Sequence, residues 1–589
     1  MLDPFVGSGV TLAEASCQGI PSLGLDINPI AVLITEVTLN PPPQEAFEDA
    51  SRRLLDYLAS VAGVLWDAEN GGVVRYAVHE ILVVCPSCGS CVGARAARVA
   101  ARNYRCPDCE TRLRFNLRTL ERTRVVGVRL GDGSAREEIF QAQEEVSQNP
   151  GVSPVEGYSF EFAENRRTLA HPGMQTMDLF TPRNFALLTR AARFIESESS
   201  ESVRNALELM LSATVAQCSR LIAYRGDLAT GGPAWSVPGF WVPPIHLEAN
   251  PTIHLKARSR KFASGFASLH KRPRQAPAKV ELCDSTVALE ALWAAGQRFD
   301  LIFLDPPYGD SVPYLEFSSL FNSFLRLAPD PSLDLSVSDR RGAEDGWNTY
   351  ESRLGAVISQ SSRLLTETGC LLLTFNNHDE RAWNALIDGL HGADLWCSTL
   401  YYQVPAVISA KAQLAPAGSY VGDFVGVFRR RSPSARRKTT LRTVRAALCR
   451  AANARGGVIP ATTARRVAIG AFLEENLEGA LLPGVYKLLA ELFESLPSGE
   501  LLLHKRLREL DTEDVDLDEL VARVARDLEE DGCTRWTELY EAVCEASATI
   551  GVPEPHEVVK LLEPGYVFVG KTWAPRMAST HGGRIKTLF

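Results

Sequence analysis

The first segment with chemical potential is a glycine loop at the start of the chain. D-P-F-V-G-S-G (residues 3–9) lies between a clipped strand and a helix predicted over Val10–Gln18. Glycines let the backbone approach a ligand closely, and a helix N-terminus favours negative charge. Asp26 closes a strand predicted over Ser22–Leu25, and an acidic residue about 20 residues after such a loop suits ribose hydroxyls. The third glycine of the dinucleotide pattern G-x-G-x-x-G is absent.

The second segment follows a strand predicted in the second half of the chain. The apolar run Phe299–Leu304 ends in Asp305, Pro306, Pro307 and Tyr308. Two prolines directly after a strand stop its hydrogen-bonding ladder and stiffen the loop. The carboxylate of Asp305 and the carbonyl of Pro306 can accept both hydrogens of an exocyclic amine, which aims the nitrogen lone pair at an electrophile. Tyr308 offers a face on which a flipped-out base can stack.

Together these segments resemble the DNA amino-methyltransferases, which use S-adenosylmethionine. D-P-F-V-G-S-G-V-T-L-A-E-A with G-L-D-I-N-P-I-A resembles the first two motifs of that family, and D-P-P-Y resembles the fourth. The resemblance implies that Asp26 holds the ribose, Ile27 packs on the adenine ring and Asp284 takes the adenine amino group. Asp284 equally suits a helix N-cap. The methionine part of the cofactor is then surrounded by Asp3, Phe5, Gly7 and Gly9.

The cysteines predict a structural metal centre. C-P-S-C and C-P-D-C form two C-x-x-C pairs whose four thiolates can close a tetrahedral Zn²⁺ site, with ligands Cys85, Cys88, Cys106 and Cys109. A closed site of this kind leaves no open position for catalysis. Cys91 is a bystander or an alternate ligand. The arginines around the ribbon suit phosphate contact or a solvated face; they are Arg95, Arg98, Arg102, Arg105, Arg112 and Arg114.

With the cysteine pairs included, the sequence resembles adenine-specific DNA methylases that carry a zinc ribbon, often found in restriction or phage-defence loci. The implied fold class is α/β: a Rossmann-like S-adenosylmethionine-dependent methyltransferase sheet with a large zinc-ribbon insert and a mainly helical C-terminal domain. We expect the core in residues 1–42 and 280–430, with a terminal antiparallel pair at Leu395–Gln403 and Asp423–Phe428. The insert spans 43–279, with its ribbon at about 80–115, and the C-terminal domain spans 431–589.

The insert occupies the place where a target-recognition region could lie. Val73–Val84 is interpreted as a hairpin that leads to the cysteines. The loop with Trp235, Phe240 and Trp241 could touch DNA or pack on the core, and the basic tail after it leaves the same two alternatives open. That tail carries Lys256, Arg258, Arg260, Lys261, Lys271, Arg272 and Arg274.

Composition leaves these interpretations open. The 589 residues carry a formal net charge of −9, but DNA binding depends on where basic residues sit rather than on the total. No apolar run approaches the roughly 18 residues of a membrane span, and the N-terminus is no signal peptide. We therefore expect a cytoplasmic protein with reduced cysteines, DNA as its partner and no membrane partner.

Several alternatives remain beside adenine-N6 methylation of DNA. Methylation at cytosine C5 is disfavoured, because the Pro-Cys dipeptide usual in that family is absent. A cytosine-N4 enzyme would more often have serine at Asp305. An RNA amino-methyltransferase shares D-P-P-Y-G, although Asn28 and Pro29 after Asp26 look more like the DNA enzymes. A non-catalytic DNA-binding subunit of a defence complex is the last alternative.

The N-terminus departs from the family pattern. That family normally has a segment before the glycine loop that supplies the first strand and an aromatic contact to the cofactor, whereas this sequence begins at Met1 and Leu2. We expect that either an upstream extension or an upstream-encoded polypeptide completes the cofactor site, or that the site is weakened. The chain alone should then bind S-adenosylmethionine poorly, because an unpaired slot in a parallel sheet exposes backbone groups.

Overall fold

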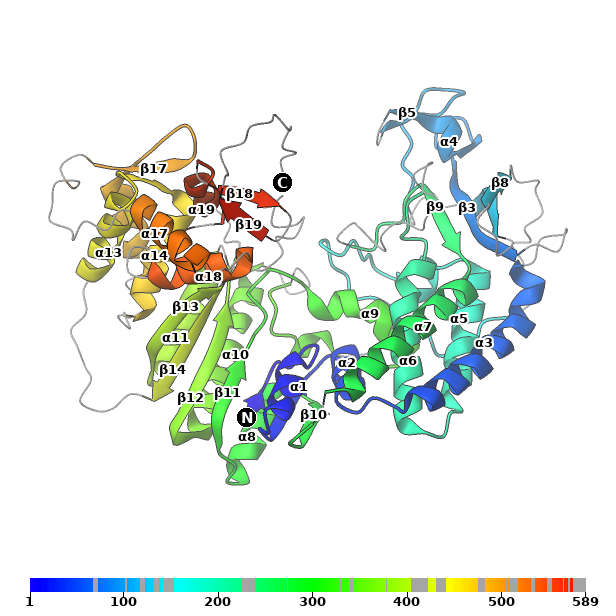
Figure 1. Ribbon diagram of the computed structural model, residues 1–589. Helices are drawn as coiled ribbons and strands as arrows, with labels where there is room; N and C mark the ends of the chain where they lie inside the picture. Colours follow the sequence, from blue (N-terminus) through cyan, green and yellow to red (C-terminus); the bar gives the residue numbers. More distant parts are fainter. Residues whose placement is uncertain are drawn as a thin grey trace. The chain divides into compact units, whose positions relative to one another are not determined.

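The computed structural model shown in Figure 1 describes most of the chain. It divides into two compact units, one of residues 1–288 with 310–349 and one of residues 289–309 with 350–589. The residues outside the description are 67–72, 101–102, 117–121, 132–136, 141–152, 225–238, 273, 328–329, 339–342, 378, 404–421, 431–440, 475–481, 505–506, 508–516, 531–534, 548–552, 554, 565, 570–571 and 576–589.

The central element is a seven-stranded mixed sheet in the order β10-β2-β1-β11-β12-β14-β13. In the first unit, β2 (Ser22–Asp26) pairs in parallel with β1 (Leu2–Asp3) on one side and β10 (Ala278–Leu282) on the other. Leu2 and Leu25 are fully buried, so these short strands belong to the interior rather than to a frayed edge. The α/β class expected from the sequence is therefore observed.

The second unit contributes the remaining four strands, which lie side by side in Figure 1. β11 (Phe299–Leu304) runs parallel to β12 (Leu365–Phe375). β14 (Asp423–Arg430) is antiparallel to both β12 and β13 (Leu395–Gln403). The terminal antiparallel pair is thus confirmed, and it reaches two residues further than expected, to Arg430.

Helices alternate with these strands along the chain. α1 (Val10–Cys17) and α2 (Pro29–Leu39) follow β1 and β2. α2 begins with Pro29 at its first position. The first N–H groups of a helix have no partner within the helix, so the missing N–H of proline costs no hydrogen bond there. α8 (Ser285–Ala294) follows β10, while α10 (Ala343–Leu364) and α11 (Glu380–Gly392) flank β12.

The insert pairs a small sheet with a helical layer. β3 (Val73–Val84) is a single twelve-residue strand between β7 (Arg122–Gly131) and β9 (Ile245–Ala249), and the hairpin expected there is wrong. Eight consecutive side chains of β3, from Tyr76 to Val83, are buried, and no Gly, Asn or Asp interrupts the strand to form a tight turn. Both faces of β3 are therefore covered. A strand buried on both faces need not alternate apolar and polar residues, and that alternation was the basis of the hairpin prediction.

Four helices of the insert lie side by side in Figure 1, and their buried side chains form one apolar core. They are α3 (Gln44–Trp66), α5 (Pro182–Glu196), α6 (Glu201–Val215) and α7 (Pro251–His270). The basic composition of α7 obscured its helical character. Its buried residues Leu255, Ala263 and Phe266 nevertheless lie on one helical face.

A buried carboxylate ties the two layers of the insert together. Glu248 on β9 accepts hydrogen bonds from Arg183 Nε at 2.7 Å, from the Thr181 hydroxyl, and pairs with His79 Nε2 at 2.7 Å. Burial alone would raise the pKa of Glu248, but the charges of Arg183 and His79 outweigh it and hold that pKa well below its usual range. Arg183 also stacks 4.0 Å above the ring of Trp66.

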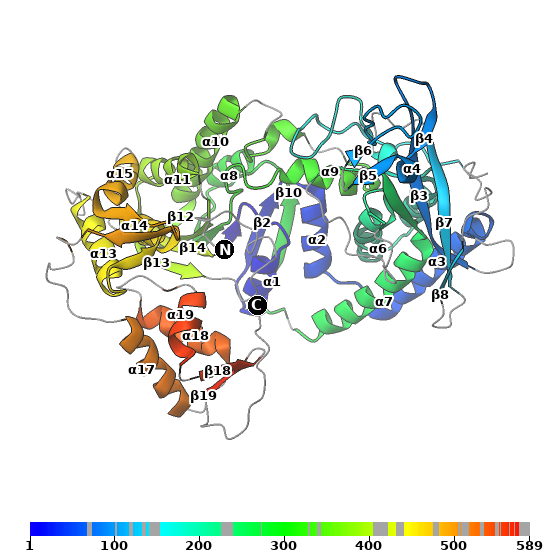
Figure 2. The same cartoon turned by 90° about the horizontal axis from the view of Figure 1, so that it is seen from above.

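The C-terminal region is mainly helical. Figure 2 shows three of its helices gathered beside a two-stranded sheet of β18 (Tyr566–Val569) and β19 (Thr572–Pro575). These helices are α17 (Leu517–Glu530), α18 (Trp536–Ala546) and α19 (Pro555–Leu562), and they share an apolar core with the sheet. α13 (Arg442–Asn453) and α14 (Ala461–Glu474) form a second group with a three-stranded sheet, whose strands are in the order β15 (Val458–Pro460), β17 (Glu500–Leu503) and β16 (Phe493–Ser495). Among the described helices, none combines the length and apolar character needed to cross a membrane.

Candidate functional site

The glycine loop is shaped by two left-handed residues. Gly7 has φ 52° and Gly9 has φ 75°, conformations that residues with a Cβ rarely adopt. A Cβ on Gly9 would also lie 2.6 Å from the side chain of Thr35 on α2. The Thr35 hydroxyl donates a 3.1 Å hydrogen bond to the Gly7 carbonyl. The two glycines therefore let α2 close directly against the loop.

Two carboxylates organise this loop from within. Asp3 is only 1 % exposed, and it accepts hydrogen bonds from the Phe5 backbone N–H at 3.1 Å and from the Thr11 hydroxyl. Asp26 accepts from the Gly7 N–H at 3.0 Å. Burial raises the pKa of Asp26 to about 6, despite the hydrogen bonds that lower it. Asp3 thus holds the loop, while Asp26 joins the loop to the end of β2.

The remaining residues assigned to the cofactor lie around the same strand ends. Phe5 and Ile27 are half-buried. Asp284 accepts hydrogen bonds from the Thr286 N–H at 2.8 Å and its hydroxyl at 2.6 Å, so the helix-capping interpretation is observed at α8. Ser285 donates to the Pro4 carbonyl at 2.6 Å, which ties the start of α8 to the glycine loop. The structure therefore brings these predicted residues together at one edge of the first unit.

The segment after the D-P-P-Y motif supports that edge. α9 (Tyr314–Phe324) carries Asn322, which is fully buried. Its amide donates to the Asn28 side chain at 3.1 Å and accepts from the Ile30 N–H at 3.1 Å. Asn322 thereby fixes the turn between Asp26 and α2. No role was predicted for this segment from the sequence; the available signal was the single amide side chain beside Leu320, Phe321 and Phe324.

The insert holds the start of this same segment. Arg167 donates to the carbonyl oxygens of Asp310 and Ser311, the latter at 2.9 Å. Beside it, the Asn165 amide donates at 3.2 Å to Glu316, which is buried on α9. The first residues after the D-P-P-Y-G sequence are therefore positioned by the insert.

In the second unit, β11 delivers Asp305 to an exposed position at its carboxyl end. One carboxylate oxygen of Asp305 accepts two hydrogen bonds, from the Tyr308 hydroxyl at 2.6 Å and from the Thr374 hydroxyl at 2.7 Å. The Tyr308 ring packs 5.3 Å from that of Phe375, at an angle of 56°. Burial and the adjacent Asp305 carboxylate raise the pKa of Tyr308 well above its usual range, so its hydroxyl keeps its proton.

Pro307 and Tyr308 are held by their backbone carbonyls. Asn377 donates to the Tyr308 carbonyl at 2.7 Å, and the buried Tyr350 donates to the Pro307 carbonyl at 3.0 Å. The sequence interpretation overlooked both residues and Thr374. The signal was present, because Asn376 and Asn377 directly follow the apolar strand β12 at the edge where polar groups gather in parallel sheets.

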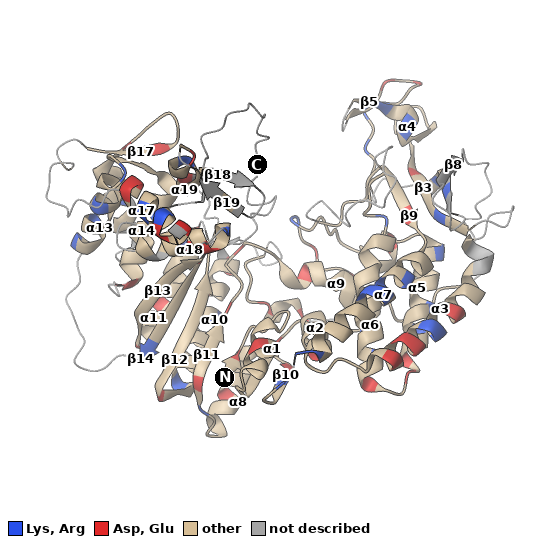
Figure 3. Ribbon diagram, viewed as in Figure 1, with Lys and Arg blue, Asp and Glu red and all other residues tan. Residues whose placement is uncertain are grey.

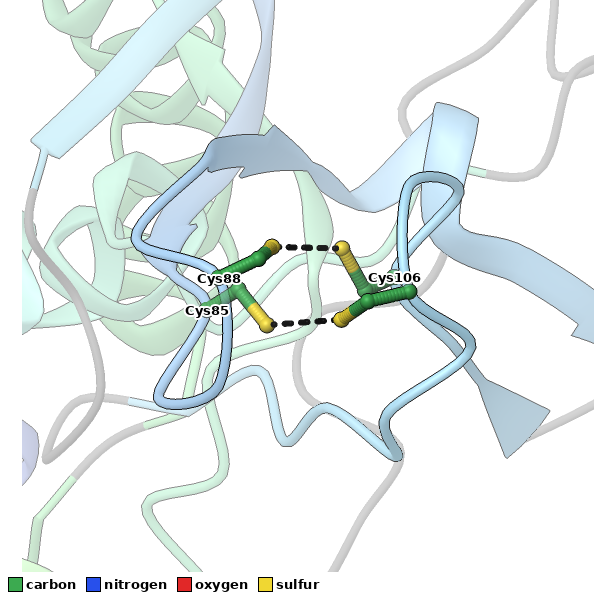
Figure 4. A group of neighbouring side chains, drawn as sticks. Cys85, Cys88 and Cys106 are labelled. Atoms are coloured by element: carbon green, nitrogen blue, oxygen red, sulfur yellow. Dashed lines mark hydrogen bonds between the residues drawn. The ribbon is translucent and has the colours of Figure 1, made fainter.

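The four predicted metal ligands converge. Their sulfur atoms all lie within 4.8 Å of one another, and Figure 4 shows the two opposing loops that supply them. The Sγ atoms of Cys85 and Cys109 are 3.5 Å apart, and those of Cys88 and Cys106 are 3.6 Å apart. A tetrahedron with Zn–S bonds of about 2.3 Å requires about 3.8 Å between sulfurs. The cluster can therefore hold a metal ion such as zinc, and Cys91 lies outside it.

The two metal-binding loops have equivalent backbones. The Cys85 carbonyl accepts a hydrogen bond from the Gly89 N–H, and the Cys106 carbonyl accepts one from the Glu110 N–H, each at 2.9 Å. The donor residues Gly89 and Glu110 both have left-handed backbone conformations. Hydroxyls approach the exposed ligands in the same way, Ser90 at 3.4 Å from Cys88 and Thr111 at 3.3 Å from Cys109. The hydrogen bonds of Ser90 lower the pKa of Cys88 to about 6, whereas burial raises that of Cys106 to about 11.

The structure assigns other roles to part of the proposed DNA-contacting residues. Phe240 is 2 % exposed and stacks 4.6 Å from Phe162, so it is a core residue. Arg272 forms a two-bond ion pair with Glu14 on α1, at 2.9 and 2.8 Å. Arg274 donates to the Thr38 carbonyl on α2. These arginines fasten the insert to the helices beside the glycine loop. Trp235 lies outside the described residues.

No known protein family has a model that matches this sequence, and no curated protein is similar to it.

Proposed function

We propose that the protein is an S-adenosylmethionine-dependent methyltransferase that acts on the N6 amino group of adenine in DNA, within a restriction or phage-defence system. The observation that carries the proposal is the Asp305–Tyr308 turn at the end of β11. There Asp305 is exposed, yet two hydroxyl donors fix the orientation of its carboxylate. A rigid acceptor at an exposed strand end suits the recognition of an amine.

The order of the sheet supports the cofactor assignment. Numbered along the chain, its strands follow 3-2-1-4-5-7-6. This matches the doubly wound order through five strands and differs by an antiparallel seventh strand inserted before the sixth. Sheets of this class bind ligands beyond the carboxyl ends of the strands where the order reverses. The glycine loop lies at the carboxyl end of strand 1 in the first unit, and Asp305 lies at the carboxyl end of strand 4 in the second.

The donor set of the glycine loop fits a cofactor with a ribose. The carboxylate of Asp26 would accept from the ribose hydroxyls, with its position fixed by the Gly7 N–H. Phe5, Gly7 and Gly9 would surround the methionine part, while Ile27 would pack on the adenine ring. The bound cofactor supplies an electrophilic methyl group. Asp3 has both carboxylate oxygens engaged inside the loop, so its role is to hold the loop in shape.

The chain's contribution to the reaction is orientation. Asp305 and the Pro306 carbonyl accept the two hydrogens of the adenine amine, which directs the nitrogen lone pair at the methyl carbon. The amine nitrogen would replace the cofactor's sulfur at the methyl carbon, and one amine proton would pass to water beside the exposed carboxylate of Asp305. Tyr308 packs against the flipped-out base, and its hydroxyl keeps the Asp305 carboxylate in place.

Methyl transfer is tested with labelled S-adenosylmethionine, first on duplex DNA and then on RNA. We expect label in N6-methyladenine of DNA. Asp305→Ala should abolish transfer while cofactor binding persists, because Asp305 has no part in the cofactor site. Asp305→Asn should retain some activity, since its amide oxygen still accepts one hydrogen bond. Unchanged turnover in Asp305→Ala would overturn the assignment, and transfer to RNA alone would move the substrate to RNA.

A further inference from the structure

The second metal-binding loop carries arginines on a face that the fold leaves charged. Arg105 and Arg112 flank the loop from Cys106 to Thr111 and are partners in an antiparallel bridge. Beyond the bridge, buried Leu113 and Phe115 alternate with exposed Arg112 and Arg114. Arg105, Arg112 and Arg114, which we call the arginine face, therefore share the exposed side of this short antiparallel pair. Figure 3 shows further basic segments of the same module at α4 (Ala94–Ala97) and β5 (Arg98–Ala100).

Two members of the arginine face, Arg105 and Arg112, lie opposite each other without a neutralising carboxylate among their contacts with the described residues. Like charges directly opposite each other in an antiparallel pair are destabilising. Arg105 donates at 3.3 Å to the Glu110 backbone carbonyl rather than to a carboxylate, and Arg112 makes no ion pair within the described part of the chain. Within residues 103–116 the acidic side chains are Asp108 and Glu110. The like charges of Arg105 and Arg112, held opposite each other at the surface, can be neutralised by an anion from outside the chain.

The aromatic side chains near the arginine face indicate which kind of anion could bind there. Single-stranded nucleic acids are typically bound by exposed aromatic faces on which bases stack. Here Tyr104 is half-buried and Phe115 is buried, and their rings pack 5.0 Å apart. The module therefore presents guanidinium groups without a stacking platform. That combination fits the phosphate backbone of a duplex.

We infer that the arginine face contacts the phosphate backbone of duplex DNA and positions the substrate without reading its sequence. The inference rests on the proposed function, which makes DNA the substrate. The main competing role is internal, because four thiolates with one Zn²⁺ leave a net charge of about −2 that arginines can balance. Salt dependence separates the two roles, since only a phosphate contact releases counterions from DNA.

The test replaces the three arginines with glutamine in the full-length, zinc-loaded protein. Binding to a fluorescein-labelled DNA duplex is followed by anisotropy as a function of salt. Each lost phosphate contact lowers the slope of log K against log salt by about 0.9, so R105Q/R112Q/R114Q should reduce it by about 2.7. Between about 50 and 200 mM salt, the native protein should lose about 40-fold more affinity than the variant.

The matched control is R52Q/R298Q/R526Q, which removes the same charge at three exposed arginines outside the module. We expect the control to keep the native slope, and both variants to keep their zinc. An unchanged slope in R105Q/R112Q/R114Q would overturn the inference, as would equal losses of slope in the two variants. Loss of zinc with an unchanged slope would assign the arginines to the metal centre. Methyl transfer by the native protein, assayed separately, tells such a failure apart from failure of the proposed function.

Discussion

The sharpest test of the proposed chemistry is the removal of one hydroxyl beside Asp305. Thr374→Val keeps the shape of the side chain and deletes the donor of the 2.7 Å hydrogen bond to the Asp305 carboxylate. Tyr308 then remains as the donor to the same oxygen, at 2.6 Å. The carboxylate gains rotational freedom, so fewer encounters have it aligned with the amine.

The size of the effect follows from the hydrogen bond that is lost. A bond to a charged group contributes about 1.5–3 kcal/mol. Asp305 is exposed, so water replaces part of the lost interaction and the low end of that range applies. We therefore expect kcat to fall about tenfold, since about 1.4 kcal/mol corresponds to a factor of ten. The KM for S-adenosylmethionine should not change, because the hydroxyl bonds to Asp305 and to the Tyr308 hydroxyl, both of which are assigned to the base rather than to the cofactor.

The structure supplies a matched control on the same pair of strands. Thr366 on β12 donates at 2.8 Å to Asp300 on β11, a bond of the same kind at the other end of the strands. Thr366→Val should destabilise the sheet to a similar extent and leave turnover at the native value. Single-turnover methylation of a DNA duplex compares the two variants. Equal turnover in both would refute the role given to the Asp305 carboxylate.

Three further predictions address the metal centre, the cofactor loop and the insert. Elemental analysis should find one zinc per chain, lost in Cys88→Ser and kept in Cys91→Ser, because Cys91 lies outside the ligand group; native protein purified without chelator that holds no metal would contradict this. Asp26 must be ionised to accept from ribose hydroxyls and has a pKa of about 6, so cofactor affinity measured by calorimetry should be retained above that pH and fall as pH drops through it, approaching tenfold per unit. The same pH profile in Asp26→Asn would contradict that cause. Arg183→Ala leaves the buried charge of Glu248 without its main partner and should cost about 3–5 kcal/mol, seen as a lower thermal midpoint. Arg183→Ala/Glu248→Gln should recover part of the loss, and an unchanged midpoint in the single variant would show that the ion pair contributes little.

Local sequence determined much of the framework. The strand Phe299–Leu304 and the terminal pair begin at the predicted residues, because short stretches dominated by apolar and aromatic residues favour strands. The four metal ligands were also predictable, since two C-x-x-C pairs define a tetrahedral site whatever surrounds them. In each case the information lies within a short stretch of chain.

Tertiary structure decided what these segments contact. The basic composition of the segment after α7 gave no hint that Arg272 would pair with Glu14, because the two residues are far apart in sequence. Asn322, Thr374 and Asn377 support the predicted motifs from other elements, and their roles depend on which strand or helix lies next to which. The strand β3 was misread as a hairpin for the same reason, since neighbours on both faces set its burial. Sequence patterns report the chemistry of a segment, whereas the partners of a buried or charged side chain are fixed only when distant segments pack together.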